Sequence, residues 1–193
     1  MAPAVSRHRP RLLHAAVELL ADSGPRALTH AGLDRRTGVP VGTTSNYYRT
    51  RIELLAGVVD HLIAKDREAL DRIKAELGQA TDERSVLALC VRMVDFLTGP
   101  GRSLSLARFA LLLESGQHSE LAARMARSAA EVQRTTAAAL QHAAVPAPEA
   151  AAERLLVTLN GLVLARITYG REVDVQAALQ PVVASVFTPA GCS

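Results

Sequence analysis

The sequence predicts an all-α protein with about nine helices. Almost every segment of the 193-residue chain repeats its apolar residues with the 3.6-residue period of a helix. The alternating pattern that marks β-strands is absent. Glycine and proline stand at the breaks between the periodic segments, as at Gly24-Pro25 and Gly99-Pro100-Gly101. The chain is also long enough to bury a substantial core.

Four helices are predicted in the first part of the chain. The first carries Pro10 in its first turn, which proline tolerates because the N–H groups there have no helical partner. Thr29 is expected to cap the second helix, and Gly38 to supply the turn that follows it. Thr50 and Glu53 form a capping-box pattern at the start of the long fourth helix. The four helices run from Pro10 to Gly24, over 30–37, over about 41–47 with Pro40 at the N1 position, and from Thr50 to Gly78.

Five more helices are expected in the rest of the chain, and no repeat period relates them. Their apolar residues place them over 82–98, 103–115, 119–143, 149–169 and 173–187. The alanine-rich segment 119–152 carries regularly spaced Glu and Arg, so it is interpreted as helix rather than as low complexity.

Composition excludes several classes of protein. A hydrophobic content of 49% is too high for a disordered chain, and no apolar run reaches the ~18 residues of a membrane span. His14 and Glu18 interrupt the apolar stretch near the basic N-terminus, which favours an amphipathic helix of a cytoplasmic protein over a signal peptide. Cys90 and Cys192 make no disulfide framework. Cys90 lies on an apolar helix face and is expected to pack, with redox sensing as the alternative.

Charge divides the chain into two predicted domains, residues 1–51 and 52–193. The first holds eight arginines and three acidic residues, a net charge of +5, whereas the second has a net charge of −2. A basic head on a mildly acidic body suggests that the head binds a polyanion. A solvated basic face is the alternative that charge alone leaves open.

The head has the pattern of a helix-turn-helix DNA-binding domain. Two short helices flank Gly38 and follow a packing helix, so the second short helix would enter the major groove. Its threonines can bond base or phosphate oxygens, and Asn46 can read adenine. Gly42 would let the backbone approach DNA closely. No arginine or lysine lies within that helix, so the positive charge must come from its flanks.

The spacing of the head residues is more specific still. The pattern consists of two segments with Thr29 between them. The segments are Arg9-x2-Leu12-Leu13-x-Ala15-Ala16-x2-Leu19-Leu20-x3-Gly24 and Gly38-Val39-Pro40-Val41-Gly42-Thr43-Thr44-Ser45-Asn46-Tyr47-Tyr48-Arg49-Thr50-Arg51-x2-Leu54. They resemble the N-terminal domain of TetR-family transcriptional regulators. The resemblance implies an all-helical homodimer with three head helices that read DNA and a variable body that binds a small ligand. Most members of the family are repressors.

The resemblance also implies DNA contacts for individual residues. Thr29 matches a phosphate contact, and Arg51 replaces the usual lysine at the start of the fourth helix while keeping its phosphate-binding charge. The recognition-helix positions that face DNA hold Thr43, Thr44, Asn46 and Tyr47. Tyr48 stands where the family has Phe and is interpreted mainly as core. Ser45 replaces a usual aromatic residue, and Pro40 replaces a common Ser, which exchanges a side-chain cap for a fixed backbone angle.

The segment from Glu153 to Leu164 resembles the penultimate helix of the family, which usually joins a four-helix bundle between subunits. One apolar stripe of this helix is predicted to form the dimer interface; it consists of Leu156, Leu159, Val163 and Ile167. A second stripe is bordered by Leu155, Leu162 and Ala165–Arg166. Two apolar sides need two partners, the body's own core and a second subunit. A helix buried wholly within a monomer is the alternative.

Family ligands lie among the body helices, so polar residues that interrupt apolar faces are candidate ligand contacts. The candidates are His61, Arg92, Arg108, Glu114 and Asn160, with Met93, Phe96 and Phe109 as apolar lining. Arg108 stands among apolar residues at helical spacing, and a buried arginine needs an acidic partner or an anionic ligand. A structural ion pair with Glu114 or Asp95 is the alternative for Arg108, and ordinary core packing is the alternative for the apolar three.

The predicted function is that of a transcriptional regulator, most simply a repressor, that binds a near-palindromic DNA operator as a homodimer and is released by a small-molecule effector. The sequence holds no G-x-S-x-G, P-loop or G-x-G-x-x-G motif, so no enzyme and no cofactor are predicted. The spacing of His61 and Asp66 is not a recognised metal-ligand pattern. The alternative is a helical DNA-binding or interaction protein whose body binds a protein partner instead of a small molecule.

Overall fold

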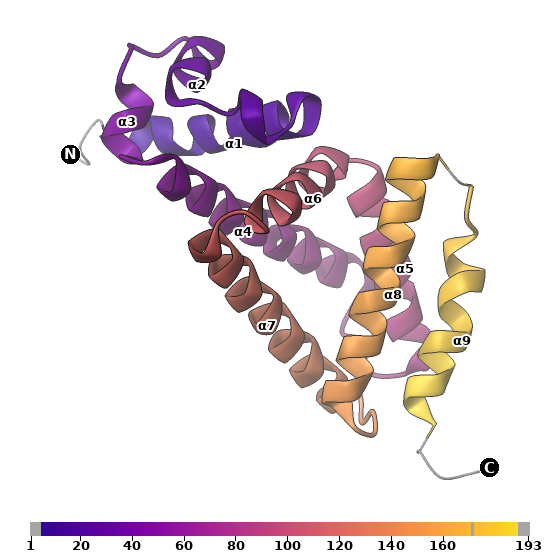
Figure 1. The fold of residues 1–193 in the computed structure, drawn as a ribbon. Coiled ribbons are helices and arrows are strands. Elements are labelled where there is room, and N and C mark those ends of the chain that lie inside the picture. Colours follow the sequence, from indigo (N-terminus) through magenta and orange to yellow (C-terminus); the bar gives the residue numbers. More distant parts are fainter. Residues whose placement is uncertain (1–4, 171, 189–193) are drawn as a thin grey trace. The chain divides into compact units, whose positions relative to one another are not determined.

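The computed structural model describes residues 5–170 and 172–188, and this part of the chain is helical throughout, without strands (Figure 1). The bounds of its elements are α1 (Val5–Ser23), the 3₁₀ turn η1 (Pro25–Ala27), α2 (His30–Thr37), α3 (Thr43–Tyr47), α4 (Arg51–Leu77), α5 (Glu83–Thr98), α6 (Arg102–Ser115), α7 (Ser119–His142), α8 (Pro148–Tyr169) and α9 (Val175–Phe187). The all-α prediction is therefore confirmed. None of these helices is long and apolar enough to cross a membrane.

The chain folds as two compact units, which we call unit 1 and unit 2. Unit 1 comprises Met1–Lys65 and Ser103–Ser128, and unit 2 comprises Asp66–Arg102 and Ala129–Ser193. This division differs from the predicted boundary at residue 51. The reason is that α6 and the start of α7 share a core with the N-terminal helices, since Ala107, Leu111 and Leu121 are fully buried in it.

The core of unit 1 is built from the apolar stripes that the sequence predicts. The most deeply buried members from α1 and α4 are Leu12, Ala16, Val17, Leu20, Leu54, Leu55, Val58, Val59 and Leu62. Burying each leucine contributes about 1.5–3 kcal/mol. The short helices α2 and α3, with 8 and 5 residues, would be marginal in isolation and depend on packing against this core.

Unit 2 has a separate core formed chiefly by α5, α8 and α9, which pack against one another (Figure 1). Its buried residues include Val94, Leu155, Leu179 and Val183. Cys90 also lies in this core, and burial raises the pKa of its thiol to about 11. A thiol with so little thiolate at neutral pH is a poor nucleophile, which favours the packing interpretation over redox sensing. Cys192 lies outside the described residues.

Local capping explains where several helices begin and end. Thr29 Oγ1 accepts a hydrogen bond from the Gly32 N–H at 3.0 Å and caps α2, as predicted. The expected capping box of α4 is also present. Thr50 Oγ1 accepts from the Glu53 N–H at 3.1 Å, and the Glu53 carboxylate accepts from the Thr50 N–H at 3.2 Å.

Two prolines lie elsewhere than predicted. Helix α1 begins at Val5, so Pro10 is inside the helix rather than in its first turn, and α1 lacks one backbone hydrogen bond there. Helix α3 begins only at Thr43, so Pro40 precedes the helix. The reason for the second difference is that the Pro40 carbonyl accepts from the Thr43 N–H at 3.1 Å and closes a turn before the helix starts.

Candidate DNA-binding site

Helices α2 and α3 form the predicted helix-turn-helix. Gly38 ends α2 with φ 65°, in the left-handed region that favours glycine, and its N–H bonds the last carbonyls of α2. Gly42 precedes α3 with φ 88°. A side chain at Gly42 would be strained at this angle, and glycine cannot cap the helix with a side chain of its own.

Asp34 of α2 supplies the cap that Gly42 cannot. One carboxylate oxygen accepts from the Gly42 N–H at 2.7 Å, and the other accepts from the Thr44 N–H at 2.8 Å and the Thr44 hydroxyl at 2.5 Å. Asp34 is only 2% exposed. Burial acts to raise the pKa of Asp34, but the hydrogen bonds from Thr44 and Gly42 prevail and hold that pKa below its ordinary value. The two helices are therefore joined through one ionised side chain.

Tyr48 fixes the other end of α3. Its ring is 4% exposed, which confirms the core interpretation. The His30 ring contacts the Tyr48 carbonyl at 2.7 Å, and Arg9 donates to the Tyr48 hydroxyl at 3.2 Å. A Cβ atom at Gly57 of α4 would lie only 2.5 Å from the ring, so glycine is required there for the ring to pack so closely.

The solvent-exposed side of α3 and its preceding turn form the candidate surface for base contacts. Val41 is 94% exposed, Ser45 and Asn46 are exposed, and Thr43 is partly buried. The amide of Asn46 is thus available, as predicted. Sequence reasoning did not select Val41 or Ser45, because their exposure depends on how the five-residue helix packs on its core.

The structure gives two predicted contact residues a structural role instead. Thr44 is fully buried, and its hydroxyl is committed to Asp34. Tyr47 is partly buried against the core of unit 1, and its hydroxyl oxygen is buried without a hydrogen-bond partner among the described residues. Neither side chain lies on the exposed side of α3, because the buried side of a short helix must face its neighbours.

Unit 1 also carries several exposed arginines outside α3. Arg26, Arg35 and Arg49 are exposed, and none has an acidic partner among the described residues. Arg36 differs, since it pairs with Asp22 at 3.2 Å and with Glu18 at 3.6 Å. These exposed arginines give the segments before and after α3 positive charge that can attract a polyanion.

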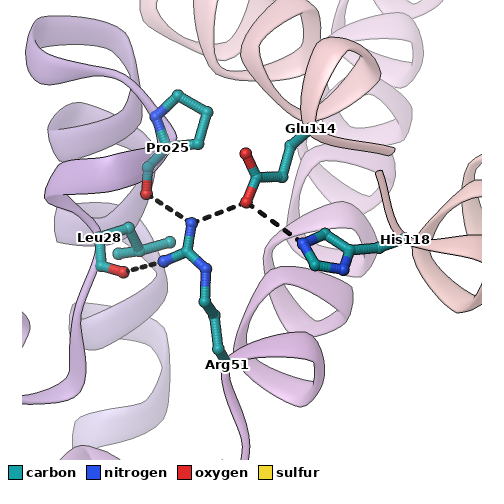
Figure 2. Close-up of polar contacts among 5 residues, drawn as sticks. All are labelled: Pro25, Leu28, Arg51, Glu114 and His118. Atoms are coloured by element: carbon teal, nitrogen blue, oxygen red, sulfur yellow. Dashed lines mark hydrogen bonds and ion pairs between the residues drawn. The ribbon is translucent and has the colours of Figure 1, made fainter. Parts of the chain in front are cut away.

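Arg51 has a different environment from the one predicted (Figure 2). Its guanidinium donates to the carbonyls of Leu28 at 2.5 Å and Pro25 at 2.7 Å, and it pairs with Glu114 of α6 at 2.9 Å. The same Glu114 oxygen lies 3.7 Å from His118 Nε2. The side chain of Arg51 is 36% exposed and that of Glu114 is 15% exposed. The charge of Arg51 is thus engaged within unit 1.

The predicted ligand residues are divided between the two units. His61, Arg108 and Phe109 lie in unit 1, whereas Arg92, Met93, Phe96 and Asn160 lie in unit 2. The two carboxylates considered for Arg108 have other ion-pair partners, since Glu114 pairs with Arg51 and Asp95 pairs with Arg166 at 2.9 Å.

One pocket of unit 2 brings two predicted ligand residues together. Arg92 and Phe96 line a pocket of about 350 Å³ that is open to solvent, with Ala69, Arg72, Ile73, Glu76, Asp95 and Pro100. Arg72 lies over the Phe96 ring at 5.8 Å from its centre, and Arg92 pairs with Glu76 at 2.6 Å. Asn160 is exposed on α8, and neither it nor Met93 lines this pocket.

The predicted dimer stripe is largely turned inward. Val163 is 3% exposed and Ile167 is 8% exposed, so both belong to the core of unit 2. Leu156 and Leu159 are partly buried. The large apolar side chains that α8 exposes are Val157 (67%), Leu164 (38%) and Tyr169 (71%), the last residue of the helix. Gly161 lies between Val157 and Leu164, with open space above its Cα atom.

Comparison with known proteins agrees with a helix-turn-helix regulator that has a helical C-terminal domain. A sequence model described as "Tetracyclin repressor-like, C-terminal domain" matches residues 81–189, which is more than half of the chain. The chain therefore belongs to the TetR family of transcriptional regulators, DNA-binding proteins that also bind ligands. The comparison with curated protein sequences finds no significant match.

Solved structures show the same fold. A TetR-family regulator from Mesorhizobium loti is similar with a TM-score of 0.79 at 15% identity, over 95% of this chain and 96% of that one. A transcriptional regulator from Rhodococcus sp. Rha1 has a TM-score of 0.76 at 21% identity, over 92% and 95% of the two chains. A regulator from Saccharomonospora viridis, solved in complex with choline, has a TM-score of 0.72 at 20% identity, over 92% and 94%.

Proposed function

We propose that this protein is a ligand-released transcriptional repressor that binds a near-palindromic operator as a homodimer. The observation that carries the proposal is the Asp34-capped helix-turn-helix, which exposes Val41, Ser45 and Asn46. Unit 1 also exposes arginines that have no acidic partner among the described residues. Asparagine can bond adenine at its N6 and N7 atoms, and a valine can contact the thymine methyl group. Thr29, at the exposed start of α2, is proposed to contact phosphate.

The DNA contacts are testable through salt and through Asn46. Binding to genomic fragments selected by the purified protein should weaken steeply as salt rises, because phosphate contacts release counterions. Asn46→Ala should cost about 1–3 kcal/mol on the preferred site and much less on a mismatched site, so sequence preference relaxes. Both effects are measured by fluorescence anisotropy with matched and mismatched duplexes.

Gln141→Ala is the matched control, because it removes an exposed amide side chain from α7 of unit 2 and should leave sequence preference unchanged. Affinity that stays constant across salt concentrations would contradict DNA binding. An unchanged preference in Asn46→Ala would remove that residue from the base contacts.

The homodimer is proposed to use the exposed side of α8. Val157, Gly161 and Leu164 are spaced by four and three residues and so share one face of the helix. An exposed apolar face with a glycine allows a second helix to approach closely. Leu156 and Leu159 would border this contact, while Val163 and Ile167 support it from within the core.

Introducing a charge on this face should separate the subunits. Val157→Glu is expected to convert a dimer into a monomer, because a dimer would bury the new carboxylate against apolar groups. Light scattering coupled to size exclusion measures the mass. Leu113→Glu is the control, since Leu113 of α6 is 80% exposed and lies away from α8 in the sequence. A wild-type monomer, or a Val157→Glu dimer, would refute this interface.

The effector is proposed to bind unit 2 at the pocket lined by Arg92 and Phe96. Its apolar wall and charged rim would suit a small molecule with both apolar and polar groups. One observation favours a second candidate, in which a protein partner takes the place of the effector, because the pocket is open to solvent. Screening products of the genes beside the selected fragments for DNA release distinguishes the two.

A further inference from the structure

We infer that Arg51 acts as a clamp that holds the end of α6 against the α1–α2 connection, and that it supports DNA binding through this clamp rather than by contacting a phosphate. The inference rests on the proposed DNA binding. It assigns a positioning role to Glu114 of α6 and reverses the phosphate role that the family resemblance implies for Arg51.

The first reason to assign Arg51 a clamp role is that most N–H donors of its guanidinium are already engaged within unit 1. An arginine has five N–H donors, and both of those on Nη2 are used, one by Pro25 and one by Glu114. Nη1 gives a third hydrogen bond, to Leu28. A move toward DNA would leave two carbonyls and a largely buried carboxylate without these donors, and each such loss is costly.

The second reason is the negative charge of Glu114, which lies beside the Arg51 guanidinium. Any phosphate placed within hydrogen-bond distance of the Arg51 guanidinium would also lie close to the Glu114 carboxylate. Like charges at such separations repel, so Glu114 opposes the contact that a free arginine would make. The Glu53 carboxylate accepts a hydrogen bond from the Arg49 backbone N–H at 2.6 Å, but the Arg49 guanidinium forms no ion pair with a described carboxylate. Arg49 is also exposed, which makes it the better phosphate ligand on this segment.

The clamp joins three segments of unit 1 that are far apart in sequence. Arg51 begins α4, Pro25 and Leu28 lie between α1 and α2, and Glu114 is in the last turn of α6, 63 residues away from Arg51 (Figure 2). His118 approaches Glu114 from the turn after α6, and it adds a second cationic partner when protonated. The position of α6 is thus linked to the helices that carry the DNA-binding surface.

Salt titrations of DNA binding separate a clamp from a phosphate ligand. The probe is a genomic fragment that the purified wild-type protein selects, and the variants are Arg49→Ala, Arg51→Ala, Arg51→Lys, Glu114→Gln and the double variant Arg51→Ala/Glu114→Gln. Arg49→Ala should reduce the slope of log K against log salt by about 0.9, as the loss of one phosphate contact does. Arg51→Ala and Glu114→Gln should each weaken binding about tenfold at an unchanged slope.

Two further comparisons sharpen the test. The double variant should be no weaker than the worse single variant, because both changes break one interaction. Arg51→Lys keeps the charge but loses the forked geometry, so a clamp predicts a loss similar to that of Arg51→Ala. A reduced slope in Arg51→Ala, a wild-type affinity in Arg51→Lys, or tighter binding by Glu114→Gln would overturn the inference.

Amide hydrogen exchange without DNA tests the clamp separately from the proposed function. Arg51→Lys and Glu114→Gln should both speed exchange in residues 24–28 and 112–118, while Arg49→Ala should not. If the wild type selects no DNA but these segments lose protection, the proposed function fails and the clamp stands. If their protection is unchanged, the clamp is wrong. Arg51→Lys and Glu114→Gln carry the test should Arg51→Ala fail to fold.

Discussion

Asp34→Asn is expected to lower the free energy of unfolding by about 2–3 kcal/mol, although asparagine and aspartate have nearly the same shape. Both Asp34 oxygens accept hydrogen bonds from donors, the Gly42 N–H on one side and the Thr44 N–H and hydroxyl on the other. In asparagine an NH₂ group replaces one of these oxygens. Its N–H groups would then face the N–H or O–H donors of Gly42 or Thr44, so the hydrogen bonds on that side would be lost. Urea denaturation followed by circular dichroism measures the loss.

DNA binding should fall by more than tenfold in the same variant, because a loosened α3 must be reordered when DNA binds. Asp22→Asn is the matched control. Asp22 is an exposed aspartate on the neighbouring helix α1 and pairs only at the surface with Arg36, so its loss should cost less than about 1 kcal/mol. Equal stabilities for Asp34→Asn and the wild type would show that the carboxylate does not cap α3.

The Asp34 prediction has a defined pH dependence. The pKa of Asp34 is lower in the folded chain than the ordinary value near 3.9, so its stabilising effect is complete above that value and is lost as pH falls through the folded pKa. The stability difference between the wild type and Asp34→Asn should therefore be constant near neutral pH and shrink below about pH 4. A difference that persists undiminished in acid would contradict the ionised cap.

Gly57→Ala is expected to destabilise unit 1 by about 1–3 kcal/mol. Within a helix this substitution ordinarily stabilises by about 0.5–1 kcal/mol, because alanine has the higher helix propensity. Here the added Cβ would lie 2.5 Å from Tyr48 Cε1 and 2.9 Å from Cζ, so the buried ring must move. Since Tyr48 ends α3, its displacement should also weaken DNA binding.

A double-mutant cycle isolates the clash. In a Tyr48→Leu background the ring is absent, so Gly57→Ala should change from destabilising to neutral or stabilising. Thermal unfolding of the four proteins gives the interaction energy. An unchanged cost of Gly57→Ala in both backgrounds would mean that the ring is not the reason for glycine at this position.

Helix positions could be predicted because their ends depend on neighbouring residues. Thr29 caps α2 three residues away, and Thr50 and Glu53 cap α4 in the same way. The start of α3 was predicted less well. Gly42 offers it no side-chain cap, and the cap comes instead from Asp34, eight residues earlier. A short helix that follows glycine has no side-chain cap of its own, so its first N–H groups need a hydrogen-bond acceptor from another segment. A search for such an acceptor in the preceding helix could have identified Asp34.

The candidate site was harder to predict than the fold. The exposure of Asn46 agrees with the sequence, but the burial of Thr44 and Tyr47 depends on which side of a five-residue helix meets the core. Such a helix is too short to show a clear period. The environment of Arg51 was not predictable from its neighbours either, because Glu114 is 63 residues away.

The inward-facing and outward-facing residues of α3 have different roles, and this difference affects how the protein could evolve to recognise a new DNA sequence. Thr44 and Tyr47 face inward and maintain the helix, while Val41, Ser45 and Asn46 face outward and contribute little to the core. Surface substitutions away from caps and buried contacts usually change stability by less than about 0.5 kcal/mol. Selection could therefore exchange the outward residues for a new operator without first acquiring compensating mutations in the fold.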